Sequence, residues 1–174
     1  KSCSPHRLCY KILHKYSCEV FLTIYMSYKG KFRPTNRKKY KGDINNIVYR
    51  SLWERKFMVY CDENDDITEW GSEELIVPYI SPLDRKRHRY FPDFYIRTKN
   101  GDKFMIEIKP KKFTKPPKPT KTTRVTKAFM HETKEWARNR AKWSAAQEVC
   151  KRFGWKFLII TEDHLKMTKY IHGR

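Results

Sequence analysis

Apolar and polar positions alternate along residues 90–96 and again along residues 104–109, the period-two pattern of strands with one face in a core. Asn100-Gly101 stands between the two runs and favours a type I′ turn, because both central residues of that turn adopt positive φ. In the second run Glu107 and Lys109 are two residues apart and therefore share a face, opposite the apolar one. The pattern predicts a β-hairpin that displays a carboxylate and an ammonium side by side.

Two other stretches show the 3.6-residue period of amphipathic helices. The first covers residues 44–61, with Asp43 as the expected N-cap and Glu54 at the edge of the apolar stripe. The second extends over residues 124–153, where small residues form the expected buried stripe and Lys142 lies outside it. Both helices are therefore expected to lie against a sheet.

Shorter apolar runs at residues 67–70, 75–80 and 155–160 predict three further strands. Residues 81–89 are polar and basic and predict a loop, while the prolines of residues 110–119 predict an extended segment. Helix, strands, helix and strand in this order predict an α/β protein with a mixed central sheet flanked by helices. At 174 residues the chain is expected to form one domain.

The chain carries 39 Lys and Arg residues against 19 Asp and Glu residues, a formal net charge of +20. Such an excess predicts an anionic polymer as partner, and nucleic acid is the commonest one. The five cysteines show no paired spacing typical of a disulfide framework or a zinc site. No apolar run is long enough to span a bilayer, so no membrane partner is expected.

Basic side chains gather in three stretches of the sequence, where they suit either a DNA backbone or a solvated surface. The cations expected to contact DNA phosphates are Lys38, Lys39, Lys41, Arg85, Lys86, Arg87, Arg89, Lys111 and Lys112.

Asp93 stands on the first strand of the predicted hairpin, directly after Pro92, and is expected to neighbour Glu107 and Lys109 on the second. Two nearby carboxylates repel each other and favour a hard divalent cation with oxygen ligands, such as Mg²⁺ or Mn²⁺. A lysine beside such an ion can orient or deprotonate a water, or stabilise charge on a phosphate oxygen. These residue types predict metal-assisted hydrolysis of phosphodiesters.

The same residues also have simpler interpretations. A Glu-x-Lys pair on a strand of a chain rich in Lys and Glu is commonly a solvated face, and Glu54 alone would suit an ion pair with Arg50 or Arg55. The Pro-Asp at the start of the hairpin and the helical Glu54 upstream of it favour the metal site.

A helical Glu, a Pro-Asp, a Glu-x-Lys on the next strand, and then a helix and a strand together resemble the PD-(D/E)xK nuclease superfamily. This resemblance implies a restriction-endonuclease-like core and Mg²⁺-dependent cleavage, with Asp93, Glu107 and the carbonyl of Ile108 as metal ligands. Glu54 would be the helix carboxylate of the same metal site, and Lys109 would orient or activate the attacking water. The expected catalytic residues are Glu54, Asp93, Glu107 and Lys109.

Four longer words extend this pattern: YRSLWE at residues 49–54, EWGSEE at 69–74, HRYFPDFY at 88–95 and IEIKP at 106–110. With them the chain resembles the head completion nucleases of T-even-type tailed phages. That resemblance implies endo- and exonuclease action on packaged double-stranded DNA before head and tail join. The implied location is the head or neck of a virion assembled in the host cytoplasm, with portal or neck proteins as further partners.

The resemblance begins near Met26 and does not reach residues 1–25, which are expected to be an N-terminal extension. Residues 26–174 are then expected to form a single nuclease domain.

Two other functions remain open at the level of sequence. One is a transposon-end nuclease of the TnsA type or a junction-resolving nuclease, which would share the core but act on other DNA. The other is a neck or portal-binding head completion protein without enzymatic activity. The four intact candidate catalytic residues favour an enzyme, because loss of one acid would be the simplest sign of a lost activity.

Overall fold

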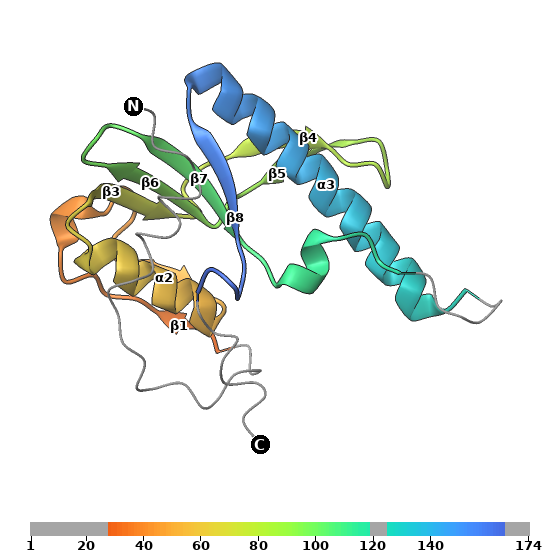
Figure 1. The fold of residues 1–174 in the computed structure, drawn as a ribbon, viewed down its shortest axis with the longest axis horizontal. Coiled ribbons are helices and arrows are strands. Elements are labelled where there is room, and N and C mark those ends of the chain that lie inside the picture. Colours follow the sequence, from red (N-terminus) through yellow and green to blue (C-terminus); the bar gives the residue numbers. More distant parts are fainter. Residues whose placement is uncertain (1–27, 119–124, 166–174) are drawn as a thin grey trace.

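The computed structural model describes residues 28–118 and 125–165, with a four-stranded sheet at its centre (Figure 1). The strands lie in the order β3-β6-β7-β8; the first three are antiparallel, and β8 runs parallel to β7. Their bounds are β3 (Ile67–Ser72), β6 (Phe94–Thr98), β7 (Lys103–Ile108) and β8 (Lys156–Ile160). The expected α/β fold with a mixed sheet is confirmed.

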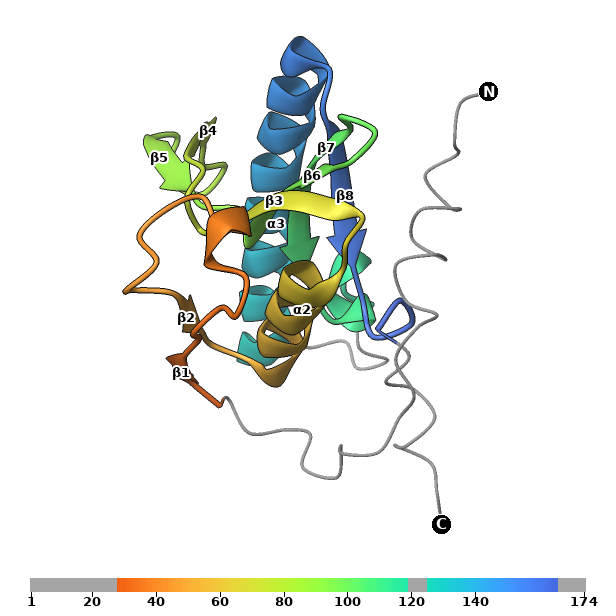
Figure 2. The same ribbon diagram turned by 90° about the vertical axis from the view of Figure 1, so that its left-hand side faces the viewer.

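Helices α2 (Leu52–Glu63) and α3 (Lys127–Phe153) cover opposite faces of the sheet (Figures 1 and 2). Phe104, Ile106 and Ile108 of β7 lie in one hydrophobic cluster with residues of α2, whereas Met105 lies in a second cluster with residues of α3. This division follows from the period of two, which sends successive side chains of a strand to opposite faces. The sheet is therefore buried on both sides.

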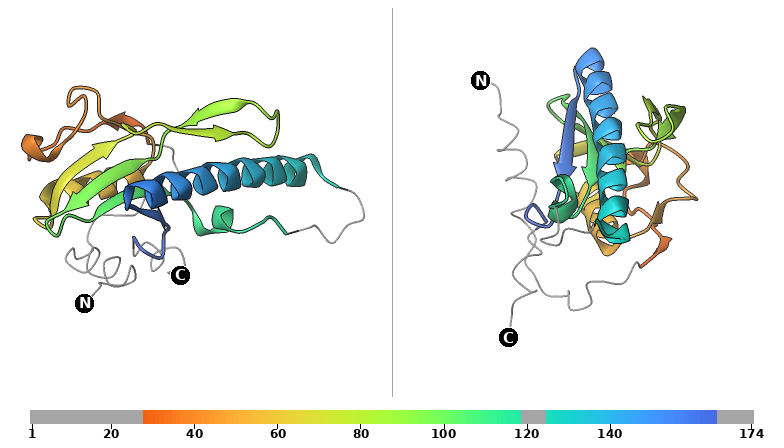
Figure 3. Two further views of the ribbon diagram at one scale, coloured as in Figure 1. Left: turned by 90° about the horizontal axis from the view of Figure 1, so that it is seen from above. Right: turned by 90° about the vertical axis from the view of Figure 1, so that its right-hand side faces the viewer.

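A separate antiparallel hairpin of β4 (Val77–Ile80) and β5 (Arg87–Tyr90), here called the basic hairpin, extends alongside α3 (Figure 3). Val77, Tyr79 and Tyr90 join the α3 cluster, so the inner face of the hairpin is anchored to the helix. The remaining elements are β1 (Gly30–Lys31), which pairs with β2 (Val48–Tyr49), and the 3-10 helices η1 (Arg37–Lys39) and η2 (Lys111–Thr114).

The expected start of the first helix, at Asp43, was wrong. Residues 43–46 form a turn in which Asn46 N–H donates to the Asp43 carbonyl, and the helix begins after Ser51 instead. Ser51 Oγ accepts from the Glu54 N–H and donates to the Glu54 carboxylate, as in the S-x-x-E capping pattern. The apolar residues before this cap pack on the core without forming a helix. Their spacing in the sequence happens to match that of an amphipathic helix.

The β6–β7 hairpin is confirmed, but its turn is not of type I′. Only Gly101 has positive φ, at 83°, and Asn100 does not. Gly101 N–H donates to the Thr98 carbonyl while Thr98 N–H donates to Asp102, which defines a three-residue loop with glycine in the left-handed region.

Two other local predictions were wrong. The first strand of the hairpin is interrupted at Pro92, because β5 ends at Tyr90 and β6 begins at Phe94, so residues 81–89 hold part of a strand rather than only a loop. Residues 110–119 contain η2 where extended chain was expected.

Helix α3 ends as its sequence suggests, at Gly154 with φ of 67°. None of the described helices is long and apolar enough to cross a membrane. The expected N-terminal extension, residues 1–25, lies outside the described residues.

Candidate active site

Asp93 lies where the β6–β7 ladder opens. The register that pairs Phe94 with Ile106 would place Pro92 opposite Ile108, and proline has no N–H to donate. The Asp93 carboxylate takes up this opening, because its Oδ2 accepts the Ile108 N–H at 2.6 Å. The proline before Asp93 thus helps to turn the aspartate side chain toward the end of β7.

Glu107 projects from β7 to the α3 side of the sheet and is only 5% exposed. Its Oε2 accepts a hydrogen bond of 2.7 Å from the Tyr90 hydroxyl, and its Oε1 lies 3.6 Å from Lys109 Nζ. Each oxygen of this buried carboxylate therefore has its own partner. The expected placement of Glu107 and Lys109 on one face is confirmed, but that face is packed rather than solvated.

The electrostatics of the two carboxylates show that they share a site. Burial raises the pKa of Asp93 well above its usual range, and the negative charges of Glu107 and Glu54 raise it further. The Ile108 N–H and the Lys109 ammonium oppose that shift. Burial and the charge of Glu107 also raise the pKa of the Tyr90 hydroxyl, which stays protonated and donates. Among the described residues, Lys109 and the Ile108 N–H therefore offset the burial of Asp93 only in part.

Glu54 lies in the first turn of α2, and its carboxylate is occupied by helix capping. Its Oε1 accepts from Ser51 Oγ at 2.8 Å, and its Oε2 accepts from the Arg50 N–H at 2.7 Å. Its charge still acts on Asp93, so the structure brings it toward the site without placing it among the nearest ligands. The alternative of a Glu54–Arg50 ion pair is not what forms, because the Arg50 guanidinium pairs with Glu73.

The oxygen donors fit a hard divalent cation. Asp93 and Glu107 supply two carboxylates, and the Ile108 carbonyl should face the Asp93 side, because the N–H and C=O of a strand residue point to the same edge. Among the described residues no three Asp, Glu, His or Cys side chains gather as a ready-made metal centre. Two carboxylates and a carbonyl with added waters match the way proteins hold Mg²⁺.

The predicted DNA contacts of the basic hairpin remain available. Arg85, Lys86, Arg87 and Arg89 are all exposed, and the one acid within the turn, Asp84, bonds to His88 at 2.8 Å. Near η1, Lys38 and Lys41 are exposed too, although Lys41 lies 3.9 Å from Glu69. Lys112 is also exposed, with its ammonium over the Phe113 ring.

Lys39 has a structural partner instead of a free ammonium. Its Nζ donates to the carbonyls of Asp62 and Asn64, both at 2.9 Å, at the C-terminal end of α2. Asp62 itself is buried, and its carboxylate accepts from the N–H groups of Thr35 and Asn36. These bonds fasten the η1 segment to the end of the helix.

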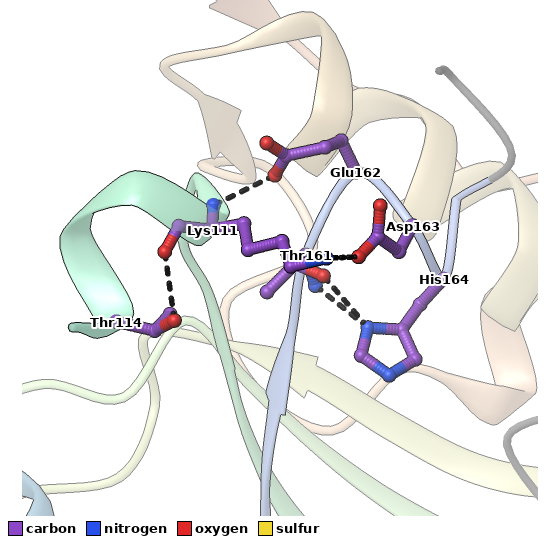
Figure 4. Close-up of polar contacts among 6 residues, drawn as sticks. All are labelled: Lys111, Thr114, Thr161, Glu162, Asp163 and His164. Carbon is purple, nitrogen blue, oxygen red and sulfur yellow. Dashed lines mark hydrogen bonds and ion pairs between the residues drawn. The ribbon is translucent and has the colours of Figure 1, made fainter. Parts of the chain in front are cut away.

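Lys111 is exposed, but its polar groups contact the turn after β8 (Figure 4). Its backbone N–H donates to Glu162 at 2.7 Å, and its ammonium pairs with Asp163. His164 Nδ1 accepts from the Thr161 N–H in the same turn. The contacts join the segment after Lys109 to the turn after β8, so Lys111 supports the site rather than presenting a free cation.

Two residues that lie near the site were not predicted from the sequence to be there. Tyr90 gave no signal beyond its place in an alternating run, and Lys142 was expected on the outer face of α3. The structure places the Lys142 ammonium 5.5 Å from the centre of the Tyr90 ring, in a half-buried position. Neither contact could be predicted, because β5, β7 and α3 are distant in the sequence.

Comparisons with known proteins agree with this geometry. The family described as TnsA-like endonuclease N terminal matches residues 64–162, which include Asp93, Glu107 and Lys109 but not Glu54. The chain is 46% identical over 143 residues to the head completion nuclease of Enterobacteria phage T4, covering 81% of this chain and 95% of that protein. No solved structure matches the chain. The chain therefore belongs to the TnsA-like endonuclease family, and the phage T4 head completion nuclease is one of its relatives.

Proposed function

We propose that this protein is a divalent-metal-dependent DNA nuclease that acts in the completion of phage heads. The observation that carries the proposal is the meeting of Asp93, Glu107 and Lys109 where the β6–β7 ladder opens. The printed name of the phage T4 relative and the description of the matching family support a nuclease. The net charge of +20 supports a nucleic-acid substrate.

In the proposed reaction, Asp93, Glu107 and the Ile108 carbonyl hold Mg²⁺ or Mn²⁺, with Glu54 acting through its charge or through a water. The bound ion would supply Lewis-acid polarisation of a phosphate oxygen and a more acidic water. Lys109 orients the attacking water or stabilises the charge that develops on the phosphate. Tyr90 fixes Glu107 by donating to Oε2, which leaves Oε1 on the side of Lys109.

The DNA backbone would lie along the exposed cations of the basic hairpin, with Lys38, Lys41 and Lys112 as further contacts. Lys39 and Lys111 drop out of this set because their ammonium groups already have partners inside the protein. We further propose that the enzyme cuts both within DNA and from its ends. It would trim packaged double-stranded DNA at the portal or neck, before the tail is joined.

The test is cleavage of linear and circular duplex DNA by the full chain with Mg²⁺, with Mn²⁺ and with EDTA. Glu107→Ala and Lys109→Ala are the site variants, each first shown to be folded and to bind DNA. Metal-dependent cutting that both variants lose supports the proposal, and cutting of circles shows endonuclease action. DNA binding without cutting under either metal, equal in parent and variants, would overturn it in favour of a non-enzymatic neck or portal protein.

Duplexes with transposon ends or four-way junctions, added to the same assay, address the remaining alternative. A strong preference for either substrate over plain linear DNA would favour a TnsA-like or junction-resolving nuclease. Equal cutting of all substrates supports the trimming of packaged DNA.

A further inference from the structure

Lys142 lies in the middle of α3 and points toward the site instead of away from the protein. Its ammonium lies 5.5 Å from the centre of the Tyr90 ring, and the Tyr90 hydroxyl donates to Glu107. Burial lowers the pKa of Lys142, the charges of Glu107 and Glu135 raise it, and the charges of Lys109 and Arg138 lower it. The Lys142 ammonium is therefore within electrostatic range of two residues of the site.

The Lys142 ammonium has no carboxylate at ion-pair distance among the residues that the structure describes. Its neighbour one turn earlier on α3, Arg138, pairs with Glu135. A half-buried charge without a counter-ion is costly, and side chains of this kind are usually paired. Glu107 is the acid whose charge acts most strongly on Lys142, but its carboxylate already accepts from Tyr90 and faces Lys109.

The charges around Lys142 indicate that its missing partner is an anion. A divalent cation bound in the site would neutralise Glu107, so that this carboxylate would no longer balance the charge of Lys142. Lys109 and Arg138 would repel any second cation near Lys142. A Tyr90 ring beside the ammonium supplies a weak attraction but no hydrogen-bond acceptor for a compact charge. An anion is the missing partner, and a phosphodiester is the anion that the site itself requires.

We propose that Lys142 binds a backbone phosphate of the DNA strand held in the site, on the α3 side of Glu107. This deepens the proposed function and rests on it. Lys109 and Lys142 would then hold neighbouring backbone oxygens, one ammonium from the sheet and one from the helix. The bound strand would then pass the end of β7 near Asp93, beside α3, and would not lie on the basic hairpin alone.

The alternative is that Lys142 serves only as a distant counter-ion for Glu107. In that case its removal would change the stability of the protein, or its requirement for metal, without changing the number of phosphates that the protein contacts. The two roles therefore differ in a binding measurement that needs no cleavage.

The experiment measures how the affinity of the full chain for a short linear duplex falls with salt concentration, in Ca²⁺, a cation with oxygen ligands that offsets the charges of Asp93 and Glu107. Lys142→Met removes the charge and keeps the length of the side chain, and Lys142→Arg keeps the charge. Lys151→Met removes an exposed lysine from the last turn of the same helix and is the matched control. Lys142→Gln provides a second neutral variant in case the methionine variant does not fold.

We expect the neutral Lys142 variants to lower the slope of log affinity against log salt by about one, the release expected from one phosphate contact. Lys142→Arg and Lys151→Met should keep the slope of the parent protein. Single-turnover cleavage by Lys142→Met, at saturating DNA and Mg²⁺, should fall by about tenfold or more.

An unchanged slope in the neutral variants would overturn the inference, and so would an equal loss in Lys151→Met. Absence of DNA binding by the parent would overturn it as well. If the parent binds DNA but cleaves none, the proposed nuclease function fails while the slope still decides the role of Lys142. If the parent cleaves and the slope does not respond, only the inference about Lys142 fails.

Discussion

The two faces of β7 differ in what they bury. On the α2 face, Phe104, Ile106 and Ile108 pack against other apolar side chains. On the α3 face, Met105 continues such a core, but Glu107 two residues later replaces the next apolar side chain with a carboxylate that is nearly as buried. One strand therefore supports the fold on one side and carries the candidate chemistry on the other.

The comparison shows how a small protein can bury a charged site without giving up its core. The α2 face is made by side chains that need only volume and apolar surface. The α3 face depends on specific partners, because Glu107 is tolerable there only with Tyr90 and Lys109 beside it. We expect substitutions on the first face to change stability, and substitutions on the second to change metal use and cleavage.

The largest effect should be the difference in the free energy of unfolding between the Ile106→Ala and Glu107→Gln variants. Removing the fully buried Ile106 side chain should lower the free energy of unfolding by about 2–5 kcal/mol. Glu107→Gln keeps an acceptor for Tyr90 and removes a buried charge, so the same quantity should change by less than about 1 kcal/mol. Urea denaturation in EDTA measures both, and a loss of similar size in the two variants would contradict the division of the faces.

Tyr90→Phe should weaken catalysis without unfolding the α3 face. The ring still fills the cluster, but Glu107 Oε2 loses its donor, and losing a bond of this kind typically costs about 10–100-fold in metal affinity or activity. A Mg²⁺ titration of the cleavage rate should show a higher requirement for metal. Tyr79→Phe, in the same cluster, is the control; an equal shift in both variants would argue for loosened packing instead.

Asp93→Asn should stabilise the metal-free protein at neutral pH, on the order of 1 kcal/mol. Burial and the charges of Glu107 and Glu54 raise the pKa of Asp93 above its ordinary 3.8, so the folded state binds this proton more tightly than the unfolded chain. The stability that this proton contributes is fully present below pH 3.8 and is lost as the pH rises through the folded-state pKa.

Denaturation curves of parent and Asp93→Asn from pH 4 to 8, in EDTA, check this sign. The gap between the two proteins should widen with pH and close toward pH 4. A gap that stays constant, or an asparagine variant that is the less stable protein at pH 7, would show that the carboxylate is not under-compensated.

The smallest effect is expected at the start of α2, from Ser51→Ala. Loss of the N-cap should lower the free energy of unfolding by about 1 kcal/mol. Because Ser51 also holds the Glu54 carboxylate, the cleavage rate reports whether Glu54 needs this orientation. Thr126→Ala removes the corresponding cap of α3 and serves as the control; a fall in cleavage confined to Ser51→Ala would support a role of Glu54 in the site.

Much of the site was predictable because its residues obey short-range rules. The alternation around Glu107 and Lys109 fixes their common face, and the hairpin brings Asp93 close to them across a short turn. The start of α2 was missed because the extended chain before Ser51 packs into the core at spacings that resemble a helix. The type of the hairpin turn was missed because Asn100-Gly101 suits more than one loop length.

The sequence by itself determined the elements that repeat over a few residues: the strands of the hairpin, the long helix to Gly154, and the carboxylates and lysine that make the site recognisable. Only the tertiary structure decided which cations have partners within the protein. Lys39 and Lys111 bind groups 23 to 52 residues away in the sequence, and the packing of α3 places Lys142 beside the site. Side-chain periodicity is a property of neighbouring residues in the chain. The partner of a charge depends on which distant segments meet, and that is settled only when both faces of the sheet are covered.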